Sequence, residues 1–367
     1  MRCGKDLLRI PGPELPREKA IEAARDWLIQ SQKTNGDGGS SKAFYLLSNK
    51  WAVSYPETSG YIISTFMDLY NLYGNEEDKV VATELAEWLL TIQTTEGAFP
   101  ALDLKMPVVF DTGQILLGLT DLYEIESKPA YADAIHRAAT WLVNQQTPAG
   151  TWRDDYSNTD HAYNSRVGWA LVKAGQLLNQ STYQEAGMRN LDWVVSQQKE
   201  NGWFHLNGFI DHARPILHTI VYAARGLLEG HALQPEQEQY LLAARRTGDV
   251  LMDIYRTEQR LHGAYDEQWR IVSQARCLVG EAQLAVLWMR LYELLQVEGY
   301  RQSAKKVITD LTRTQDITTA NKGIYGGIKG SIPVFAHYML LSYPNWATKF
   351  YLDALLLEKC IAEKLCK

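Results

Sequence analysis

Histidine and tyrosine side chains are concentrated in the polar segments between apolar helical stretches. Five of the eight histidines lie in or beside these segments: His161, His205, His212, His218 and His337. Both residue types can act as general acids or bases, for example at a carbon next to a carboxylate. Arginine and lysine in the same segments can pair with a carboxylate, sulfate or phosphate group. These segments therefore predict a site for proton transfer on an anionic substrate.

The candidate site residues come from six such segments along the chain. We expect aromatic side chains to stack on sugar rings, and Arg166, Arg214 and Lys349 to hold the anionic group. The candidate catalytic residues are His161, Tyr163, His212, Tyr343 and Asp111. The candidate substrate-binding residues are Tyr55, Glu57, Trp152, Arg166, His205, Arg214, Tyr265, Trp269, Arg276, Lys329, Trp346 and Lys349.

Several of these residues also have an ordinary structural explanation. Asp111 stands at an expected helix start, where aspartate is a good N-cap. His218 lies inside an expected helix among apolar neighbours, as a buried core histidine would. Arg276 can pair with Glu281 as a structural bridge, and Cys277 begins a buried helix as inert packing. The loop tyrosines and tryptophans serve equally well to fill space or to bind a substrate.

The sequence contains no motif for a metal ion or a nucleotide cofactor. It has no HExxH and no CxxC, and His205, Asp211 and His212 lack a recognised ligand spacing. The glycines of YGGIKGS do not form a Walker loop. We therefore expect no metal and no cofactor.

The candidate segments are tied to a repeat. Six glutamines recur at intervals of 52–61 residues, and each follows an expected helix. A glycine lies four residues after five of them, and an aromatic residue usually follows two positions later, as in WLVNQQTPAGTW at 141–152. The glutamines are Gln32, Gln93, Gln146, Gln198, Gln259 and Gln315. A period of about 55 residues indicates a repeat protein.

Each repeat reads as two helices. The helix before the glutamine is amphipathic: in 131–146, Ala134, Ala138 and Leu142 share one face while Asp133 and Arg137 lie opposite. The helix after the loop is apolar almost all round, which indicates burial. The glycine suits a helix C-cap, and the glutamine amide can satisfy backbone groups at a neighbouring helix end.

Six helix pairs can close into a ring or stack as an open solenoid. The apolar inner helices, the count of six and the buried character of the last helix at 345–364 favour closure. We therefore predict an all-α (α/α)6 toroid of about twelve helices over residues 1–367 as a single domain, with residues 1–16 as an N-terminal extension. In such a ring the candidate segments meet at one mouth, beside the N-terminal ends of the inner helices, which attract anions.

The Q-x3-G-x-W/F repeats resemble the QW-type motifs of the terpenoid cyclase and protein prenyltransferase toroids. The same ring is used by unsaturated glucuronyl hydrolases, polysaccharide lyases, acylglucosamine epimerases and glucuronyl C5-epimerases. The resemblance covers nearly the whole chain and implies the fold, whereas a fold does not determine an activity. Together with the segment composition, it implies an enzyme for an acidic, uronate-containing glycan or precursor that works by lyase, epimerase or hydrolase chemistry. Among the hydrolases of this group, aspartates in such loops would give Asp111 the role of an acid.

Two alternatives remain open. The first is an isoprenoid enzyme, although the chain has RDD at 153–155 in place of an Asp-x-Asp-Asp cluster and has no Asp-Asp-x-x-Asp. A prenyltransferase zinc site would need a cysteine, and Cys277 is the only one in mid-chain. The second alternative is a non-catalytic ring that binds a glycan or a peptide.

Composition limits the partners and the compartment. The formal charge is −6 without a run of lysine or arginine, which argues against nucleic acid. No signal-peptide core and no membrane-length apolar stretch is present, so we expect a cytoplasmic protein without membrane insertion and leave the oligomeric state open. Cys360 and Cys366 lie six residues apart in an expected helix, about 9 Å, which predicts no disulfide between them.

Overall fold

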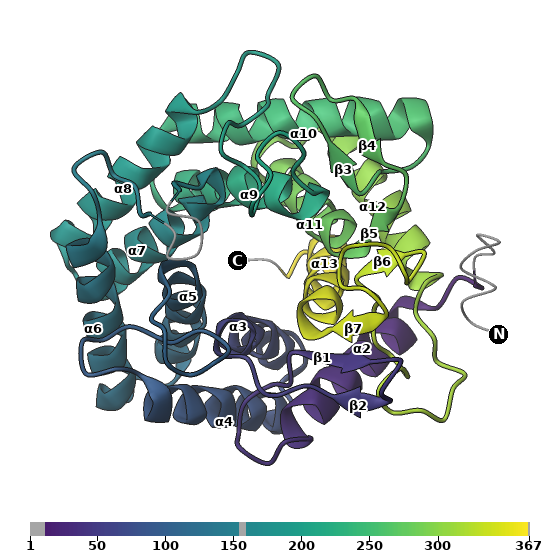
Figure 1. The fold of residues 1–367 in the computed structure, drawn as a ribbon, viewed down its shortest axis with the longest axis horizontal. Helices are drawn as coiled ribbons and strands as arrows, with labels where there is room; N and C mark the ends of the chain where they lie inside the picture. The colour runs from purple at the N-terminus through teal and green to yellow at the C-terminus, as the bar shows by residue number, and fades with distance from the viewer. Residues whose placement is uncertain (1–11, 154–158, 366–367) are drawn as a thin grey trace.

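The computed structural model describes residues 12–153 and 159–365. Its described residues form twelve α-helices in two concentric rings (Figure 1). The inner helices are α3 (Pro56–Tyr73), α5 (Val109–Ile125), α7 (Ser165–Leu177), α9 (Leu217–Leu233), α11 (Leu278–Leu295) and α13 (Asn345–Glu363). The outer helices are α2 (Arg17–Lys33), α4 (Glu76–Ile92), α6 (Pro129–Gln145), α8 (Ser181–Ser196), α10 (Glu238–Glu258) and α12 (Glu298–Thr312).

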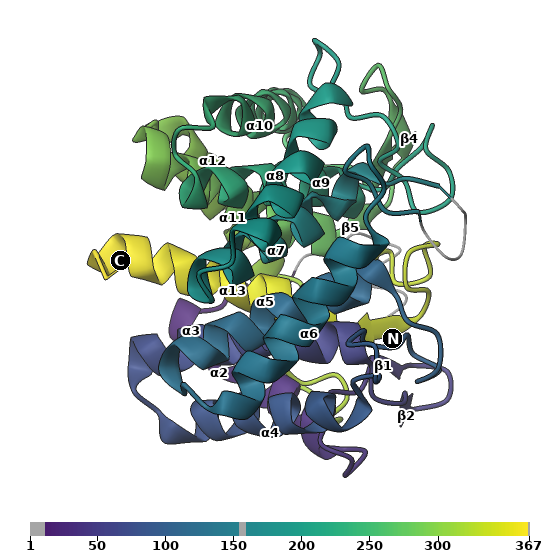
Figure 2. The same cartoon turned by 90° about the vertical axis from the view of Figure 1, so that its left-hand side faces the viewer.

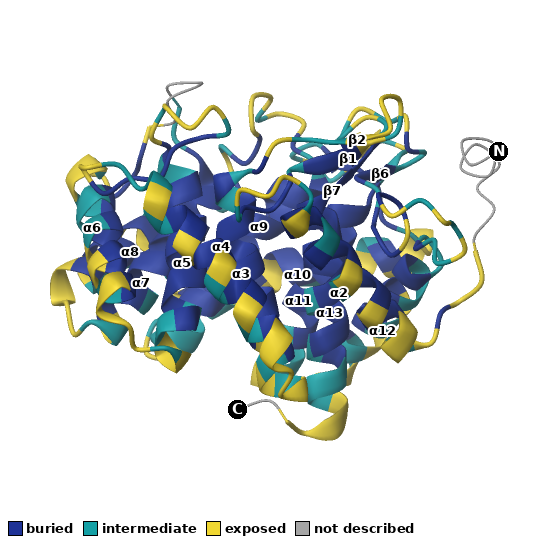
Figure 3. Cartoon of the chain, turned by 90° about the horizontal axis from the view of Figure 1, so that it is seen from below, coloured by how far each residue is buried: buried dark blue, intermediate teal, exposed yellow. Residues whose placement is uncertain are grey.

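The ring is closed. Each inner helix packs against the next, and α13 packs against α3 as well as against the first outer helix, α2. The inner helices are almost wholly buried, whereas exposed residues lie on the outer helices and on the loops (Figure 3). The predicted (α/α)6 toroid is therefore confirmed, including the alternation of an amphipathic outer helix with a buried inner one.

The short strands and long loops lie together on one side of the ring, which we call the mouth (Figure 2). Strand β7 pairs with β1, so the last connection of the chain is joined to the first. The sheets are β2-β1-β7, β3-β4 and β5-β6. The strands are β1 (Ala43–Tyr45), β2 (Lys50–Trp51), β3 (Ala264–Tyr265), β4 (Ile271–Ser273), β5 (Arg276–Cys277), β6 (Ser331–Ile332) and β7 (Ser342–Pro344).

Glycines allow the inner helices to approach one another closely. A Cβ atom on Gly118 of α5 would lie 1.9 Å from the carbonyl oxygen of Gly60 of α3. A Cβ on Gly280 of α11 would lie 2.8 Å from the backbone nitrogen of His218 of α9. Larger residues at these positions would push the helices apart, so these glycines determine how close the side chains at the centre come.

The recurring glutamines fasten each repeat to the next outer helix. In four repeats the Nε2 group donates to a glycine carbonyl in its own loop and to an alanine carbonyl inside that helix. The alanine acceptors are Ala134 for Gln93 (3.0 Å), Ala186 for Gln146 (2.8 Å), Ala243 for Gln198 (2.8 Å) and Ala20 for Gln315 (3.1 Å). We had expected the glutamine amide to bond to the end of a neighbouring helix. The alanine acceptor instead lies inside that helix.

Two expectations need correction. The inner helices are not apolar all round, because each carries charged side chains toward its C-terminal half, such as Lys173 of α7 and Arg290 of α11. Cys360 is disulfide-bonded, whereas we expected no disulfide for it. Cys366, the residue with which that expectation paired it, lies outside the described residues. No helix in the described ranges combines the length and apolarity of a membrane span.

Candidate active site

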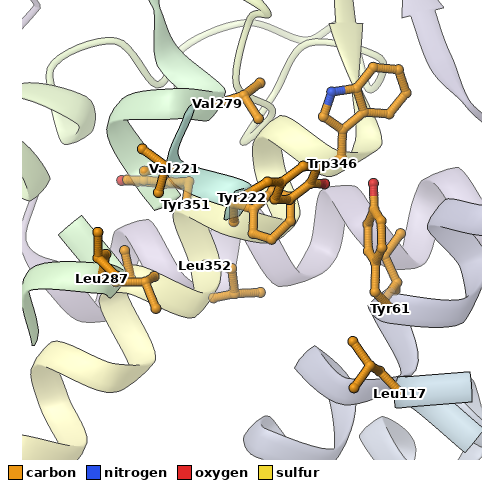
Figure 4. Close-up of a cluster of buried hydrophobic side chains, with 14 of the residues drawn as sticks. Tyr61, Leu117, Val221, Tyr222, Val279, Leu287, Trp346, Tyr351 and Leu352 are labelled. Atoms are coloured by element: carbon orange, nitrogen blue, oxygen red, sulfur yellow. The ribbon is translucent and has the colours of Figure 1, made fainter. Parts of the chain in front are cut away.

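Aromatic side chains from four inner helices and an arginine from a fifth meet at the centre of the ring. The ring of Tyr222 in α9 contacts Phe110 of α5 (5.6 Å) and Phe350 of α13 (5.9 Å), and its hydroxyl is hydrogen-bonded to Tyr61 of α3. Helices α3 and α9 lie on opposite sides of the ring. Figure 4 shows Tyr61, Tyr222 and Trp346 gathered from three inner helices. We call Tyr61, Phe110, Arg166, Tyr222 and Phe350 the central cluster; it spans the ring from side to side.

Arg166 brings a positive charge into this cluster. It lies in the first turn of α7 and is only 4% exposed. Its guanidinium faces the ring of Tyr222 at 4.6 Å, and its Nε donates to Oε1 of Gln114 at 2.6 Å. Among the described residues no carboxylate lies within ion-pair distance of it, and Nε2 of Gln114 has no partner. A buried guanidinium without a counter-ion is costly unless an anion joins it, so this position suits an anionic ligand.

Glu57 brings a carboxyl group near Arg166. It lies in the first turn of α3, directly after Pro56, whose fixed φ suits a helix start. Burial raises the pKa of the Glu57 carboxyl to about 7, although a hydrogen bond with Tyr55 and the charges of Arg166 and Lys42 act in the opposite direction. A carboxyl group with this pKa can be protonated or ionised at neutral pH, as a general acid or base requires.

Histidines line the mouth side of the cluster. The ring of His161 stacks on Tyr163 at 4.6 Å and lies 5.3 Å from His212. The loop at 206–212 holds both histidines, because the carbonyl of Gly208 contacts Nδ1 of His161 at 3.1 Å and its N–H donates to Nδ1 of His212 at 3.2 Å. Burial, together with the neighbouring His161, lowers the pKa of His212, so its neutral form is favoured.

A third histidine, His218, lies deeper in α9. Its ring is 4.4 Å from Tyr222, and Gln283 of α11 hydrogen-bonds its Nδ1. Burial, assisted by the charge of Arg166, lowers the pKa of His218 to about 3, so the imidazole is neutral at physiological pH. If the Gln283 amide donates, as its orientation here indicates, the proton of His218 resides on Nε2.

Two further predicted residues adjoin the cluster from α13. Lys349 is paired with Asp353 on its own helix, and its ammonium lies 5.4 Å from the ring of Tyr61. Asp353 accepts a hydrogen bond from Thr65 of α3 at 2.7 Å. Nε1 of Trp346 donates to the hydroxyl of Tyr338 at 2.8 Å. Lys349 is thus neutralised locally, which leaves Arg166 as the better candidate for holding an anion.

The structure divides the seventeen predicted site residues into groups. Nine lie in or beside the central cluster: Tyr55, Glu57, Asp111, His161, Tyr163, Arg166, His212, Trp346 and Lys349. Asp111 is buried in the first turn of α5, next to Phe110. Arg276, Lys329 and Tyr343 instead line a separate cavity on the flank of the ring.

The remaining five lie elsewhere. Trp152 and Tyr265 are buried in packing: the indole of Trp152 donates to the carbonyl of Leu142, and the hydroxyl of Tyr265 accepts from the N–H of His262. Trp269 donates to the carbonyl of Asn201. His205 is exposed, and Arg214 is exposed and paired with Asp211 at 2.7 Å.

The prediction from sequence did not include Tyr61, Phe110, Tyr222 and Phe350 of the central cluster, nor, as site residues, the adjacent Gln114, His218 and Gln283. All of them lie within the first two turns of the inner helices rather than in loops. A signal existed, because Gln114 and Gln283 are polar residues in otherwise apolar helices, where a buried amide needs partners. In residues 12–153 and 159–365 no group of three or more His, Cys, Asp or Glu side chains is arranged to hold a metal ion.

Comparisons with known proteins agree with this architecture. The family model of the squalene-hopene cyclase C-terminal domain matches residues 52–225, and a search of curated proteins finds no match. The solved structure of an unsaturated glucuronyl hydrolase specific for heparin is 16% identical, with a TM-score of 0.77 over 95% of this chain and 98% of that one. A D-mannose isomerase is 14% identical, with a TM-score of 0.71 over 93% and 97%. A cellobiose 2-epimerase from Bacillus thermoamylovorans B4167 is 10% identical, with a TM-score of 0.72 over 92% and 97%.

At these identities the likeness establishes the fold. The chain has the (α/α)6 toroid fold, as its repeats indicated. The fold does not determine a reaction, so a proposed function depends on the side chains at the centre.

Proposed function

We propose that the protein is an enzyme acting on a carboxylate-bearing sugar at the centre of the ring. Arg166 holds the carboxylate, the aromatic side chains of the cluster bind the sugar ring, and Glu57 transfers the proton. The observation that carries this proposal is a buried guanidinium without a carboxylate partner beside a carboxyl group whose pKa is about 7. The solved structures with this fold include proteins named as a glucuronyl hydrolase, an isomerase and an epimerase, which agrees with a sugar substrate.

The reaction we favour is hydrolysis at a terminal uronate unit. Glu57 in its protonated form gives its proton to the oxygen that leaves, the glycosidic carbon–oxygen bond breaks, and the oxygen of water bonds to the sugar carbon. Asp111, in the first turn of the adjacent inner helix, is the proposed base that takes the proton of that water. The central cluster spans the ring, so a glycan entering from the mouth reaches it only by its end.

A second candidate is proton transfer at carbon, as in epimerisation or elimination. The histidine pair at the mouth, His161 and His212, and the deeper His218 favour it, since the pKa values of His212 and His218 are lowered and a neutral imidazole can abstract a proton. Hydrolysis leaves carbon-bound hydrogens unexchanged, whereas epimerisation in deuterated water places deuterium at C5 or C2. Elimination instead yields a 4,5-unsaturated sugar.

The test is incubation in deuterated water with uronate-ended and unsaturated glucuronyl oligosaccharides, with mannose and cellobiose as neutral sugars. Products are identified by mass spectrometry and NMR. We expect Glu57→Gln to lower kcat about 10²–10⁴-fold and Arg166→Met to abolish the preference for acidic over neutral sugars. Arg301→Met, on the outer helix α12, is the matched control. Wild-type activity in Glu57→Gln, or an equal rate on neutral sugars in wild type, would contradict the respective assignment.

The same experiment distinguishes a sugar substrate from an isoprenoid substrate, which the family match at 52–225 suggests. A carbocation intermediate requires walls of hydrocarbon and aromatic rings. The inner ring instead carries ion pairs such as Lys173 with Asp121 and Arg290 with Glu229. Turnover of squalene or of a C15–C30 diphosphate, without reaction of any sugar, would replace the proposal.

A further inference from the structure

A second cavity lies on the flank of the ring, outside the central cluster. Its volume is about 440 Å³, within the range of small-molecule sites. It is enclosed by the segment before α2, the loop after α10, the end of α12 and the β5-β6 pair. It contains Arg276 and Lys329, which were predicted to bind the substrate, and Tyr343, which was predicted to be catalytic.

The floor of this flank cavity is a buried ion pair. Arg276 donates through Nε to Glu281 at 2.8 Å and through its second nitrogen to the other oxygen, in a bidentate arrangement. The Glu281 carboxylate is only 3% exposed, whereas the Arg276 side chain remains 26% exposed. The pair therefore presents its guanidinium edge to the cavity while its carboxylate is fixed behind it.

The walls add a further cation and apolar surface. Arg260 donates to Oε1 of Gln274 at 2.8 Å, and no carboxylate in the described part of the chain lies within ion-pair distance of it. Lys329 lines the cavity from the last connection, and Asp310, Arg313 and Asp316 line it as well. The ring of Tyr255 and the side chain of Ile332 provide apolar faces. Cations for an anionic group, fixed polar groups for hydroxyls and a flat apolar wall are what an acidic sugar unit requires.

We propose that the flank cavity is a second binding site, which takes one acidic sugar unit such as a uronate. Arg260 and Lys329 hold its carboxylate, and its ring lies against Tyr255. The lining of the cavity suits any anion that also carries hydroxyl groups. The choice of an acidic sugar among such anions rests on the function proposed above. The N-terminal part of α11 connects the two sites, because Glu281 holds Arg276 at the flank cavity and Gln283 contacts His218 in the centre.

Calorimetric titration with glucuronate at constant ionic strength tests this inference. Wild type is expected to bind two equivalents, and the double variant Arg260→Met/Lys329→Met is expected to lose one of them, with at least tenfold weaker binding. Arg166→Met is expected to lose the other equivalent. Both substituted cations of the flank are partly exposed, so thermal unfolding should show that the variants fold, and Arg301→Met serves as the control.

The outcomes separate the two proposals. Wild-type binding by the double variant, or a single equivalent that disappears with Arg166 alone, overturns the flank site. A single equivalent that disappears with the flank variants and persists in Arg166→Met upholds the flank site and removes the central anion site. A crystal soaked with glucuronate would then show its carboxylate next to Arg260 and Lys329, and a sugar elsewhere would contradict the assignment.

Discussion

At the scale of single residues, Glu57 links the proposed chemistry to stability. Its folded pKa of about 7 lies above the usual value of about 4.3. The folded state therefore binds this proton more tightly than the unfolded state. The stability it contributes is fully present below about pH 4.3, falls as pH rises, and is lost above pH 7.

Glu57→Gln, which resembles the protonated side chain, should remove this dependence. We expect it to match wild type near pH 4.5 and to be more stable by about 1–3 kcal/mol at pH 8. Urea unfolding at the two pH values measures the difference. Glu298→Gln, an exposed carboxylate on α12 whose pKa Arg301 lowers, should show no such gain. A Glu57→Gln protein that is destabilised equally at both pH values would show that the carboxylate is ionised and compensated in the folded state.

Gln283 is a positioning residue for His218. If Nε2 of Gln283 donates to Nδ1 of His218, the proton of His218 is held on its own Nε2. Gln283→Leu should release this tautomer and lower kcat/KM about 10–100-fold, as loss of an orienting partner commonly does. Nitrogen chemical shifts of His218 report the tautomer independently of activity. Gln296→Leu, at the exposed end of α11, is the control, and unchanged His218 shifts in Gln283→Leu would refute the role.

About half of the site residues predicted from sequence lie in or beside the central cluster. Glu57, Arg166 and His161 were predicted because they stand at helix starts, in segments where polar residues gather. Tyr222 and Gln283 were missed because an inner helix is buried on every side, so periodicity does not show which of its faces meets the ring centre. Arg276 and Lys329 were grouped with the centre because the loops that carry them are long enough to reach either the middle or the flank.

At the scale of elements, the glycines that follow the repeat glutamines differ in how closely the next outer helix approaches them. Gly150 has φ +83, and an added Cβ would lie 2.6 Å from the carbonyl oxygen of Arg189 in α8. Gly36, its counterpart in the first repeat, has φ +69 and no atom within 4 Å of such a Cβ. An alanine at either position would have a strained, positive φ. Only an alanine at position 150 would also clash with α8.

Gly150→Ala should therefore cost more than Gly36→Ala. We expect a difference of about 1–3 kcal/mol in the free energy of unfolding, the usual cost of forcing an atom into packed structure. Urea unfolding of the two variants against wild type measures it. Equal losses would mean that the loop after α6 can shift away from α8, and that the glycine is needed only for its φ.

The outer helices were predictable because a glutamine, usually followed by a glycine and an aromatic residue, marks where they end. The sixth copy was the weakest, and the structure explains why: Gln315 is followed by its glycine only at Gly326, after an insertion. Gly326 still has φ +83, and its carbonyl still accepts from the glutamine. A fixed spacing of four residues could not find this pair, whereas its contacts are the same as in the other repeats.

At the scale of the whole molecule, closure converts a chain of repeats into a ring with a seam. Gln315 fastens the last repeat to the first outer helix through Ala20, and Arg17 of α2 pairs with Glu358 of α13 at 2.6 Å. These contacts join residues about 300 positions apart. Sequence could indicate closure only through the count of six and the apolar last helix, since no local pattern reports on a contact between the chain ends.

If the seam is equivalent to the other junctions, its glutamine should contribute as much as the others do. Gln315→Ala and Gln146→Ala should each cost about 1–3 kcal/mol, because each leaves backbone carbonyls without a donor. Gln259→Ala is the matched control, since its exposed amide donates only to Arg256 of its own helix, and it should stay within about 0.5 kcal/mol. Hydrogen exchange adds the spatial test: Gln315→Ala should accelerate exchange in α2 and α13 together, although they lie at opposite ends of the chain. Faster exchange in only one of the two helices would mean that the repeats are stable without closure and that the ring can open at this junction.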